Sequence, residues 1–130
     1  MVHDYLTVAD VLGMHTVLMQ RFGGAPGVRD PGALEAALFR PQTGYYDDIV
    51  AEAAALMESL AINHPFVDGN KRSAHVCYRV FLALNGYELR ASAEAKYTHM
   101  LGLAEGSISE TEFADWLRAN IRPASRVQEP

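Results

Sequence analysis

Apolar side chains recur at intervals of three and four residues along most of the chain, the spacing that places them on one face of an α-helix. The first of these runs covers residues 8–22 and stops at Gly23, which is followed by a second glycine. Asp30 and Pro31 form an N-cap and first-turn pair, which predicts a short helix over residues 31–39.

The middle of the chain has the widest apolar face, which predicts a central helix from about residue 47 to residue 64. Pro65 ends this helix, because proline disfavours helical backbone angles in the residue before it. The apolar face consists of Ile49, Val50, Ala53, Leu56, Met57, Leu60 and Ala61. A further helix is expected over residues 70–84, closed by Asn85 and Gly86. Its apolar stripe, which should pack on the central helix, contains Val76, Val80, Phe81 and Leu84.

Capping signals place the remaining helix starts. Residues 7–10 resemble a capping box, and residues 109–112 form a complete one that opens a last helix through residue 121. Ser92 caps a helix that continues to about residue 105. Strand signals are scarce, and residues 87–90 are expected to be briefly extended.

These elements together predict a compact all-α bundle of about six helices. Residues 41–48, centred on Gly44, are typical of a loop or small hairpin before the central helix. A chain of 130 residues is long enough for one domain with a single core. We assign residues 1–122 to that domain and expect residues 123–130 to form a flexible C-terminal tail.

The composition narrows the class of protein. Hydrophobic residues make up 49% of the chain and charged residues 21%, which excludes a disordered chain. No apolar run approaches the roughly 20 residues of a membrane span, and the N-terminal residues lack the pattern of a signal peptide. Cys77 is the single cysteine and has no partner for an internal disulfide. We therefore expect a cytoplasmic protein with no membrane contact.

The charge balance is acidic, with 16 acidic and 11 basic side chains and a net charge of −5. Such a chain is a poor candidate for direct nucleic-acid binding. Lys71 and Arg72 nevertheless stand side by side in the densest polar stretch of the sequence. A local cationic spot on an acidic protein indicates a small anionic ligand.

Residues 64–72 combine the groups that phosphoryl or nucleotidyl transfer requires. They form a loop followed by a helix start, where free backbone N–H groups can hold phosphate oxygens and Gly69 allows a close approach. Lys71 and Arg72 add positive charge at the same place. Asp68 suits Mg²⁺, and the imidazole of His64 can serve as a general base near neutral pH.

Each of these residues taken singly also has a purely structural explanation. A histidine before proline is commonly a helix end, Asp68 with Gly69 is a common turn, and exposed cations are usually solvated. Both cations, however, lie at the helix end where the dipole favours acids, and the combination favours function. A metal hydrolase with His64, Asp68 and His75 as ligands is disfavoured, because Pro65 prevents a shared helical face.

The stretch from His64 to Arg72 resembles the signature of the Fic/Doc family, His-x-Phe-x-Asp/Glu-Gly/Ala-Asn-x-Arg. The similarity extends to residues 21–24, 29–32, 34–38 and 105–117, and covers the chain to about residue 121. These details resemble the Doc branch, the toxins of toxin–antitoxin pairs. The resemblance implies a Fic/Doc-like fold.

The resemblance also implies roles for individual residues. His64 corresponds to the base that accepts the proton of a target hydroxyl, and Asp68 to the acid that holds Mg²⁺. The anion pocket corresponds to Gly69, Asn70, Lys71 and Arg72, with Arg72 gripping phosphate. Residues 41–48 correspond to a flap that aligns the target segment. Two residues of the first helix, His15 and Arg21, match positions near the site.

Lys71 distinguishes two activities within the family. Fic proteins that transfer AMP from ATP have glycine at this position, whereas Lys71 resembles Doc and implies transfer of the γ-phosphate. The implied function is that of a Mg²⁺- and ATP-dependent kinase that phosphorylates a threonine of elongation factor Tu and stops translation. AMP transfer and a non-catalytic nucleotide- or partner-binding regulator are the alternatives.

The family resemblance also bears on inhibition of the enzyme. A self-inhibiting Ser/Thr-x-x-x-Glu-Gly/Asn helix is missing, because Leu101 stands four residues before Glu105. Inhibition is therefore expected from a separate Phd-like antitoxin chain whose C-terminal segment folds onto the toxin.

Overall fold

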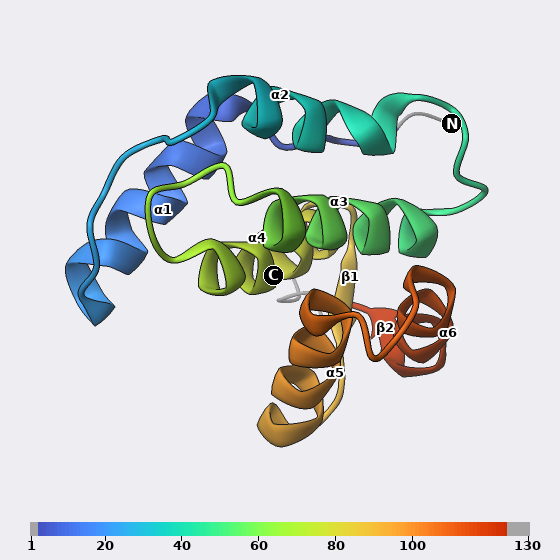
Figure 1. Ribbon diagram of the computed structural model, residues 1–130. Coiled ribbons are helices and arrows are strands. Elements are labelled where there is room, and N and C mark those ends of the chain that lie inside the picture. The colour runs from blue at the N-terminus through green and yellow to red at the C-terminus, as the bar shows by residue number, and fades with distance from the viewer. Residues whose placement is uncertain (1–2, 125–130) are drawn as a thin grey trace, which may run out of the picture.

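The computed structural model describes residues 3–124, which form six α-helices, one 3₁₀ turn and a two-stranded sheet (Figure 1). No helix among these residues is both long enough and apolar enough to cross a lipid bilayer. The elements in chain order are α1 (Val8–Phe22), α2 (Pro31–Phe39), η1 (Arg40–Gln42), α3 (Ile49–Asn63), α4 (Asn70–Leu84), β1 (Tyr87–Leu89), α5 (Ala93–Glu105), α6 (Glu110–Asn120) and β2 (Ile121–Pro123). The expected all-α bundle of about six helices is confirmed.

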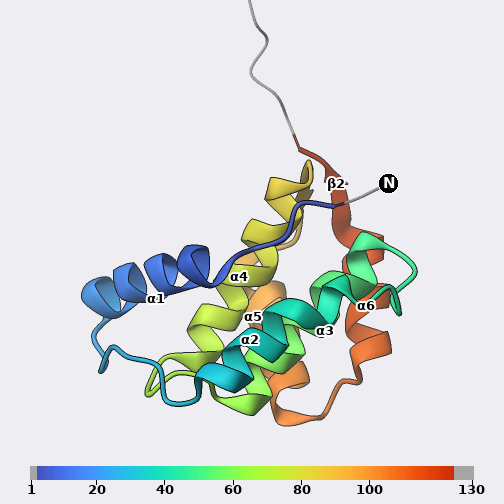
Figure 2. The ribbon, with the colours of Figure 1, turned by 90° about the horizontal axis from the view of Figure 1, so that it is seen from above.

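The helix α3 lies at the centre and contacts α2, α4, α5 and α6. Figure 2 shows α1 on one side of the α3–α4 pair and α6 on the other. All seven residues of the predicted apolar face of α3 are buried, and Ala54 and Ala55 are buried as well. Small side chains on several faces allow neighbouring helices to approach α3 closely, which explains why it is buried on nearly all sides.

Side-chain caps start five of these helices. Thr7, Asp30, Asp48, Ser92 and Ser109 each accept a hydrogen bond from a backbone N–H in the first turn that follows. Both predicted capping boxes are confirmed. The start of α4 differs, because its N-cap is Gly69 and no side chain caps it. The first-turn N–H groups of α4 therefore remain available to another acceptor.

The predicted buried stripe of α4 is wrong except for Phe81. Val80 and Leu84 are 37% and 48% exposed, and Val76 is half-buried. The buried side chains are instead Ser73, Ala74, Cys77, Tyr78, Phe81 and Leu82. Small residues allow α4 to pack tightly on α3, and the Ser73 hydroxyl is satisfied by a hydrogen bond with His15 of α1. Burial raises the pKa of the Cys77 thiol to about 12, as expected of an inert packing residue.

A short antiparallel sheet closes the C-terminal part of the fold. The extended segment expected at residues 87–90 is confirmed as β1, which pairs with β2 in the register Tyr87 with Pro123. The last helix ends at Asn120, one residue before the predicted end, because Ile121 already has extended backbone angles. Pro123 thus belongs to the sheet and not to the expected tail, and residues 125–130 of that tail lie outside the described part of the chain.

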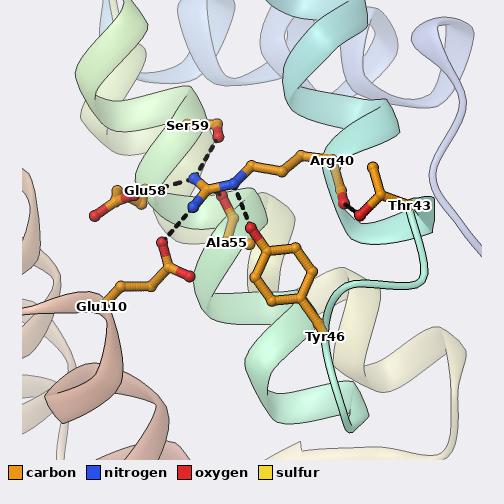
Figure 3. Close-up of polar contacts among 7 residues, drawn as sticks. All are labelled: Arg40, Thr43, Tyr46, Ala55, Glu58, Ser59 and Glu110. Atoms are coloured by element: carbon orange, nitrogen blue, oxygen red, sulfur yellow. Dashed lines mark hydrogen bonds and ion pairs between the residues drawn. The ribbon is translucent and has the colours of Figure 1, made fainter.

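Residues 43–48 form a loop, the first of the two predicted forms, and contain no strand. Arg40, just before this loop, holds it against the core (Figure 3). Its guanidinium donates hydrogen bonds to Tyr46 Oη at 2.6 Å, Ser59 Oγ at 2.9 Å, Glu58 Oε1 at 3.0 Å and Glu110 Oε1 at 2.6 Å. One side chain therefore joins the loop to both α3 and α6.

Candidate active site

His64 stands at the point where α3 ends. Its backbone has left-handed angles, φ 50° and ψ 60°, and among residues 3–124 it is the only non-glycine residue with positive φ. Pro65 disfavours right-handed helical angles at His64, which explains why α3 ends here. The His64 side chain is exposed and can meet a ligand or a protein target.

Asn70 closes the loop that follows His64. Its side-chain oxygen accepts a hydrogen bond from the Phe66 N–H at 2.9 Å, and its amide nitrogen donates to the Phe66 carbonyl at 3.1 Å. The ring of Phe66 is buried in the core and anchors the middle of the loop. Both polar atoms of the Asn70 side chain are thus hydrogen-bonded within the loop. The backbone N–H of Asn70 is the group that remains for the anion pocket that the sequence predicts.

Asp68 places a carboxylate next to the uncapped start of α4. Its Oδ1 accepts a hydrogen bond from the Gly69 N–H at 2.8 Å, and its Oδ2 accepts one from the Ala25 N–H at 3.3 Å. The side chain is exposed. Within residues 3–124, no group of three or more His, Cys, Asp or Glu side chains is arranged to hold a metal ion. A single accessible carboxylate fits Mg²⁺, which completes its coordination with phosphate oxygens and water.

Lys71 and Arg72, in the first turn of α4, are both exposed. The Arg72 guanidinium lies over the ring of Phe22 in α1, 4.2 Å from its centre. A cavity of about 430 Å³ lies beside these cations and is lined mostly by apolar side chains of α1, α4 and α5. The sequence pattern did not predict the contact between Phe22 and Arg72, because these residues belong to two helices that are distant in the sequence.

His15 supports the loop from α1. Its ring lies flat against Phe66, and its Nδ1 is 2.9 Å from the Ser73 hydroxyl in the first turn of α4. Its Nε2 is buried and has no hydrogen-bond partner among the described residues. Burial lowers the pKa of His15, and the charge of Asp68 acts in the opposite direction. His15 lies against the loop, as predicted, and Arg21 is exposed in the last turn of α1, one residue before Phe22.

Two glycines let α1 and the loop approach one another. A Cβ atom at Gly24 would lie 2.7 Å from Met19 Sδ and 3.0 Å from Asp68 Oδ2. A Cβ atom at Gly69 would collide with the methyl group of Met19. Gly69 also has a φ of 74°, which other residues rarely adopt. The positive φ at both positions, 124° at Gly24 and 74° at Gly69, together with the close approach of Met19 and Asp68, accounts for both glycines.

The structure does not bring residues 41–48 next to His64. Asp48 caps the first turn of α3 and His64 follows its last turn, and a helix of 15 residues is about 22 Å long. Figure 1 shows the loop before α3 at one end of this helix and the loop into α4 at the other. Residues 41–48 therefore do not contact His64 directly, and their alignment of a target segment stays a prediction.

His75 is the third residue of the metal-hydrolase site that the sequence disfavours. Its Nε2 lies 3.0 Å from an Arg79 nitrogen, and its side chain lines the apolar cavity. Burial and the charges of Arg79 and Lys96 lower the pKa of His75 to about 4. The imidazole is therefore neutral near pH 7.

Comparisons with known proteins agree with these features. The sequence model of the Fic/DOC family matches residues 5–82, which include α1 to α3, the whole loop between α3 and α4, and α4 except its last two residues. A protein of Mycolicibacterium smegmatis named "Toxin Doc" is 46% identical over 93 residues, 68% of this chain and 69% of that protein. The "Protein kinase doc" of Escherichia phage P1 is 34% identical over 119 residues, 88% of this chain and 93% of that protein.

Proposed function

The chain belongs to the Fic/DOC family, and from this premise we propose that it is a Doc-type toxin acting as a Mg²⁺- and ATP-dependent protein kinase. Its proposed target is a threonine hydroxyl of elongation factor Tu in the cytoplasm, and modification there would block translation. The observation that supports the proposal is the uncapped start of α4, with exposed Lys71 and Arg72 in its first turn and Asp68 just before it. His64 lies at the other end of the same loop, where α3 ends.

In the proposed reaction His64 accepts the proton of the target hydroxyl. The hydroxyl oxygen forms a bond with the γ-phosphorus of ATP, the bond from that phosphorus to the β-phosphate oxygen breaks, and ADP leaves. The exposed His64 side chain is accessible to a target chain. The buried Phe66 and the Asn70 bonds hold the loop and so limit the positions that His64 can take.

The proposed nucleotide site lies at the first turn of α4. Its backbone N–H groups and the positive end of the helix dipole attract phosphate oxygens, and Lys71 and Arg72 add two positive charges. Asp68 would hold Mg²⁺, which neutralises phosphate charge during transfer. The neighbouring apolar cavity of about 430 Å³ offers room for an uncharged part of the nucleotide.

Lys71 supports transfer of the γ-phosphate over transfer of AMP. A lysine side chain at this position occupies space that a glycine would leave open and adds a charge close to the helix start. The phage relative is named a protein kinase, which agrees with this choice. AMP transfer remains the alternative that the experiment below separates by mass.

A separate antitoxin, proposed to be Phd-like, would control this activity. The cavity of about 430 Å³ between α1, α4 and α5 shares Leu18 and Val76 with a second apolar hollow between α1 and α4. Exposed Phe22 lines the first and exposed Val17 lines the second. An apolar surface of this kind suits the amphipathic segment of a partner chain. The name of the mycobacterial relative, a toxin, agrees with a partner of this type.

The test is incubation of the purified protein with elongation factor Tu, Mg²⁺ and ATP, followed by intact-mass spectrometry of the target. A gain of about 80 Da identifies phosphorylation, and a gain of about 329 Da identifies AMP transfer. His64→Ala should abolish the gain, whereas His3→Ala, which replaces a histidine outside the loop, should retain it. No gain in mass with a toxic protein would reject this target, and an active His64→Ala would reject the proposed base.

A further inference from the structure

We propose that Arg29 is a positioning residue for His64, a role that rests on the proposed function of His64 as the base. The Arg29 side chain crosses from the segment between α1 and α2 to the end of α3. There its Nε donates a hydrogen bond to the His64 carbonyl at 2.7 Å, and its Nη2 donates one to the Asn63 carbonyl at 2.9 Å. One guanidinium thus holds the two peptide groups on either side of the His64 Cα atom.

These two carbonyls are well suited to a cation. The last carbonyls of a helix have no partner within the helix and carry the negative end of its dipole. A charged guanidinium that donates two hydrogen bonds in one plane fixes the direction of both groups more firmly than a single donor.

The backbone of Arg29 is itself held in place. The Arg29 and Asp30 N–H groups both donate to the Pro65 carbonyl, at 2.7 and 3.0 Å. One residue earlier, Val28 forms an isolated antiparallel bridge with Phe66. Figure 1 shows the segment between α1 and α2 passing beside the loop between α3 and α4. The side chain of Arg29 therefore starts from a fixed point next to the residue it holds.

His64 needs such support because its backbone angles are unfavourable. A non-glycine residue is disfavoured in the left-handed region, and such a conformation persists where its surroundings fix it. The His64 side chain is exposed, so core packing does not fix its direction. The direction of its Cα–Cβ bond, and hence of the imidazole, depends on the backbone that Arg29 holds.

A role of Arg29 in stability alone predicts a different outcome from a role in positioning His64. Arg29 is exposed, and hydrogen bonds of exposed side chains contribute little to the free energy of unfolding. Loss of Arg29 should therefore leave the protein folded while His64 changes its position. The effect should appear in His64 and in turnover, and only weakly in thermal stability.

The first experiment follows the ring signals of the five histidines by NMR in the isolated protein. The His64 signal is assigned by its loss in His64→Ala. Arg29→Ala should shift and broaden the His64 signal and leave the His99 signal unchanged, and Arg29→Lys should give an intermediate effect. Arg118→Ala, which removes an exposed arginine that contacts Asp48 and Asp115, is the matched control and should leave His64 unchanged. An unchanged His64 signal in Arg29→Ala overturns the proposal.

The second experiment measures turnover of the same folded variants. Arg29→Ala should lower kcat about 10- to 100-fold with the KM for ATP unchanged, because a displaced base affects the transition state and not nucleotide binding. Added guanidinium ion should restore part of the rate in Arg29→Ala but none in His64→Ala. A rise in KM with unchanged kcat overturns the proposal. If the wild-type protein transfers no group, the proposed function fails, and the NMR result still decides whether Arg29 positions His64.

Discussion

The imidazole of His15 and the ring of Phe66 lie face to face, with centroids 3.8 Å apart and planes inclined by 7°. His15 belongs to α1, and Phe66 to the loop that carries the candidate active site. The stacked pair, together with the hydrogen bond between His15 and Ser73, joins the first helix to the loop and to the start of α4. The site thus depends on a helix that contributes none of the four exposed polar side chains, His64, Asp68, Lys71 and Arg72.

The two hydrogen bonds between the Asn70 side-chain amide and the Phe66 backbone should be essential for the shape of the loop. Asn70→Ala removes both hydrogen bonds with the Phe66 backbone and should lower the free energy of unfolding by about 1–3 kcal/mol. Asn70→Asp keeps an acceptor for the Phe66 N–H and should cost less. Urea unfolding at pH 7 measures the difference, and equal losses in the two variants would contradict this account.

Gly69 should resist replacement for two separable reasons. Gly69→Ala introduces a Cβ atom at a φ of 74° and in collision with Met19, and should cost about 1–2 kcal/mol for the backbone angle alone. Adding Met19→Ala removes the collision but leaves the unfavourable angle. In a double-mutant cycle measured by thermal unfolding, the second substitution should therefore cost less in the Gly69→Ala background than in the wild type.

Arg40 should be the strongest polar contributor to the loop before α3 (Figure 3). Arg40→Met leaves Glu58 and Glu110 close together without their shared cation, and should lower the free energy of unfolding by about 2 kcal/mol. Burial raises the pKa of Glu110, with a further contribution from Glu58, so the loss should be largest at pH 7. Urea unfolding at pH 7 and pH 4.5 tests this, and a greater loss at the lower pH would refute it.

His75 should make the protein less stable in mild acid. Its folded-state pKa of about 4 lies below the value of about 6.5 in an unfolded chain, so the unfolded state binds the proton more readily. Stability from the neutral imidazole is complete above about pH 6.5 and is lost as the pH falls towards 4. The free energy of unfolding of His75→Gln, relative to wild type, should therefore rise between pH 7 and pH 4.5. A pH-independent difference between the two proteins would rule out this role.

Asp68 should set the dependence of the proposed reaction on Mg²⁺. Asp68→Asn keeps an acceptor for the Gly69 N–H but removes the negative charge, and should raise the Mg²⁺ concentration for half-maximal rate about tenfold or more. Asp115→Asn alters an exposed carboxylate on α6 and serves as the matched control. The measurement is the initial rate against Mg²⁺ concentration at fixed ATP, and coincident curves for Asp68→Asn and wild type would remove Asp68 as the metal ligand.

Much of the fold follows from short stretches of sequence. The helix starts at Asp30, Ser92 and Ser109 were predicted because a cap acts on N–H groups two or three residues away. The motif residues from His64 to Arg72 are contiguous, so the loop and helix start that bring them together are also local. The central position of α3 followed from the width of its apolar face.

Burial on α4 could not be predicted in the same way. The sequence pattern selected valine and leucine positions, whereas the structure buries Ser73 and Tyr78, because their environment is set by α1, α3 and α6. The partners His15 and Ser73 are 58 residues apart. No local spacing indicates which hydroxyl will be satisfied by which distant ring.

The sequence by itself determined the helical class, the helix starts and the identity of the candidate chemical groups, because these depend on residues that are close together in the chain. The tertiary structure alone decided that Arg29 reaches the carbonyls of His64, that Phe22 lies under Arg72, and that residues 43–48 are anchored by Arg40. These contacts depend on how separate helices pack, and packing is a property of the whole core and not of any single segment.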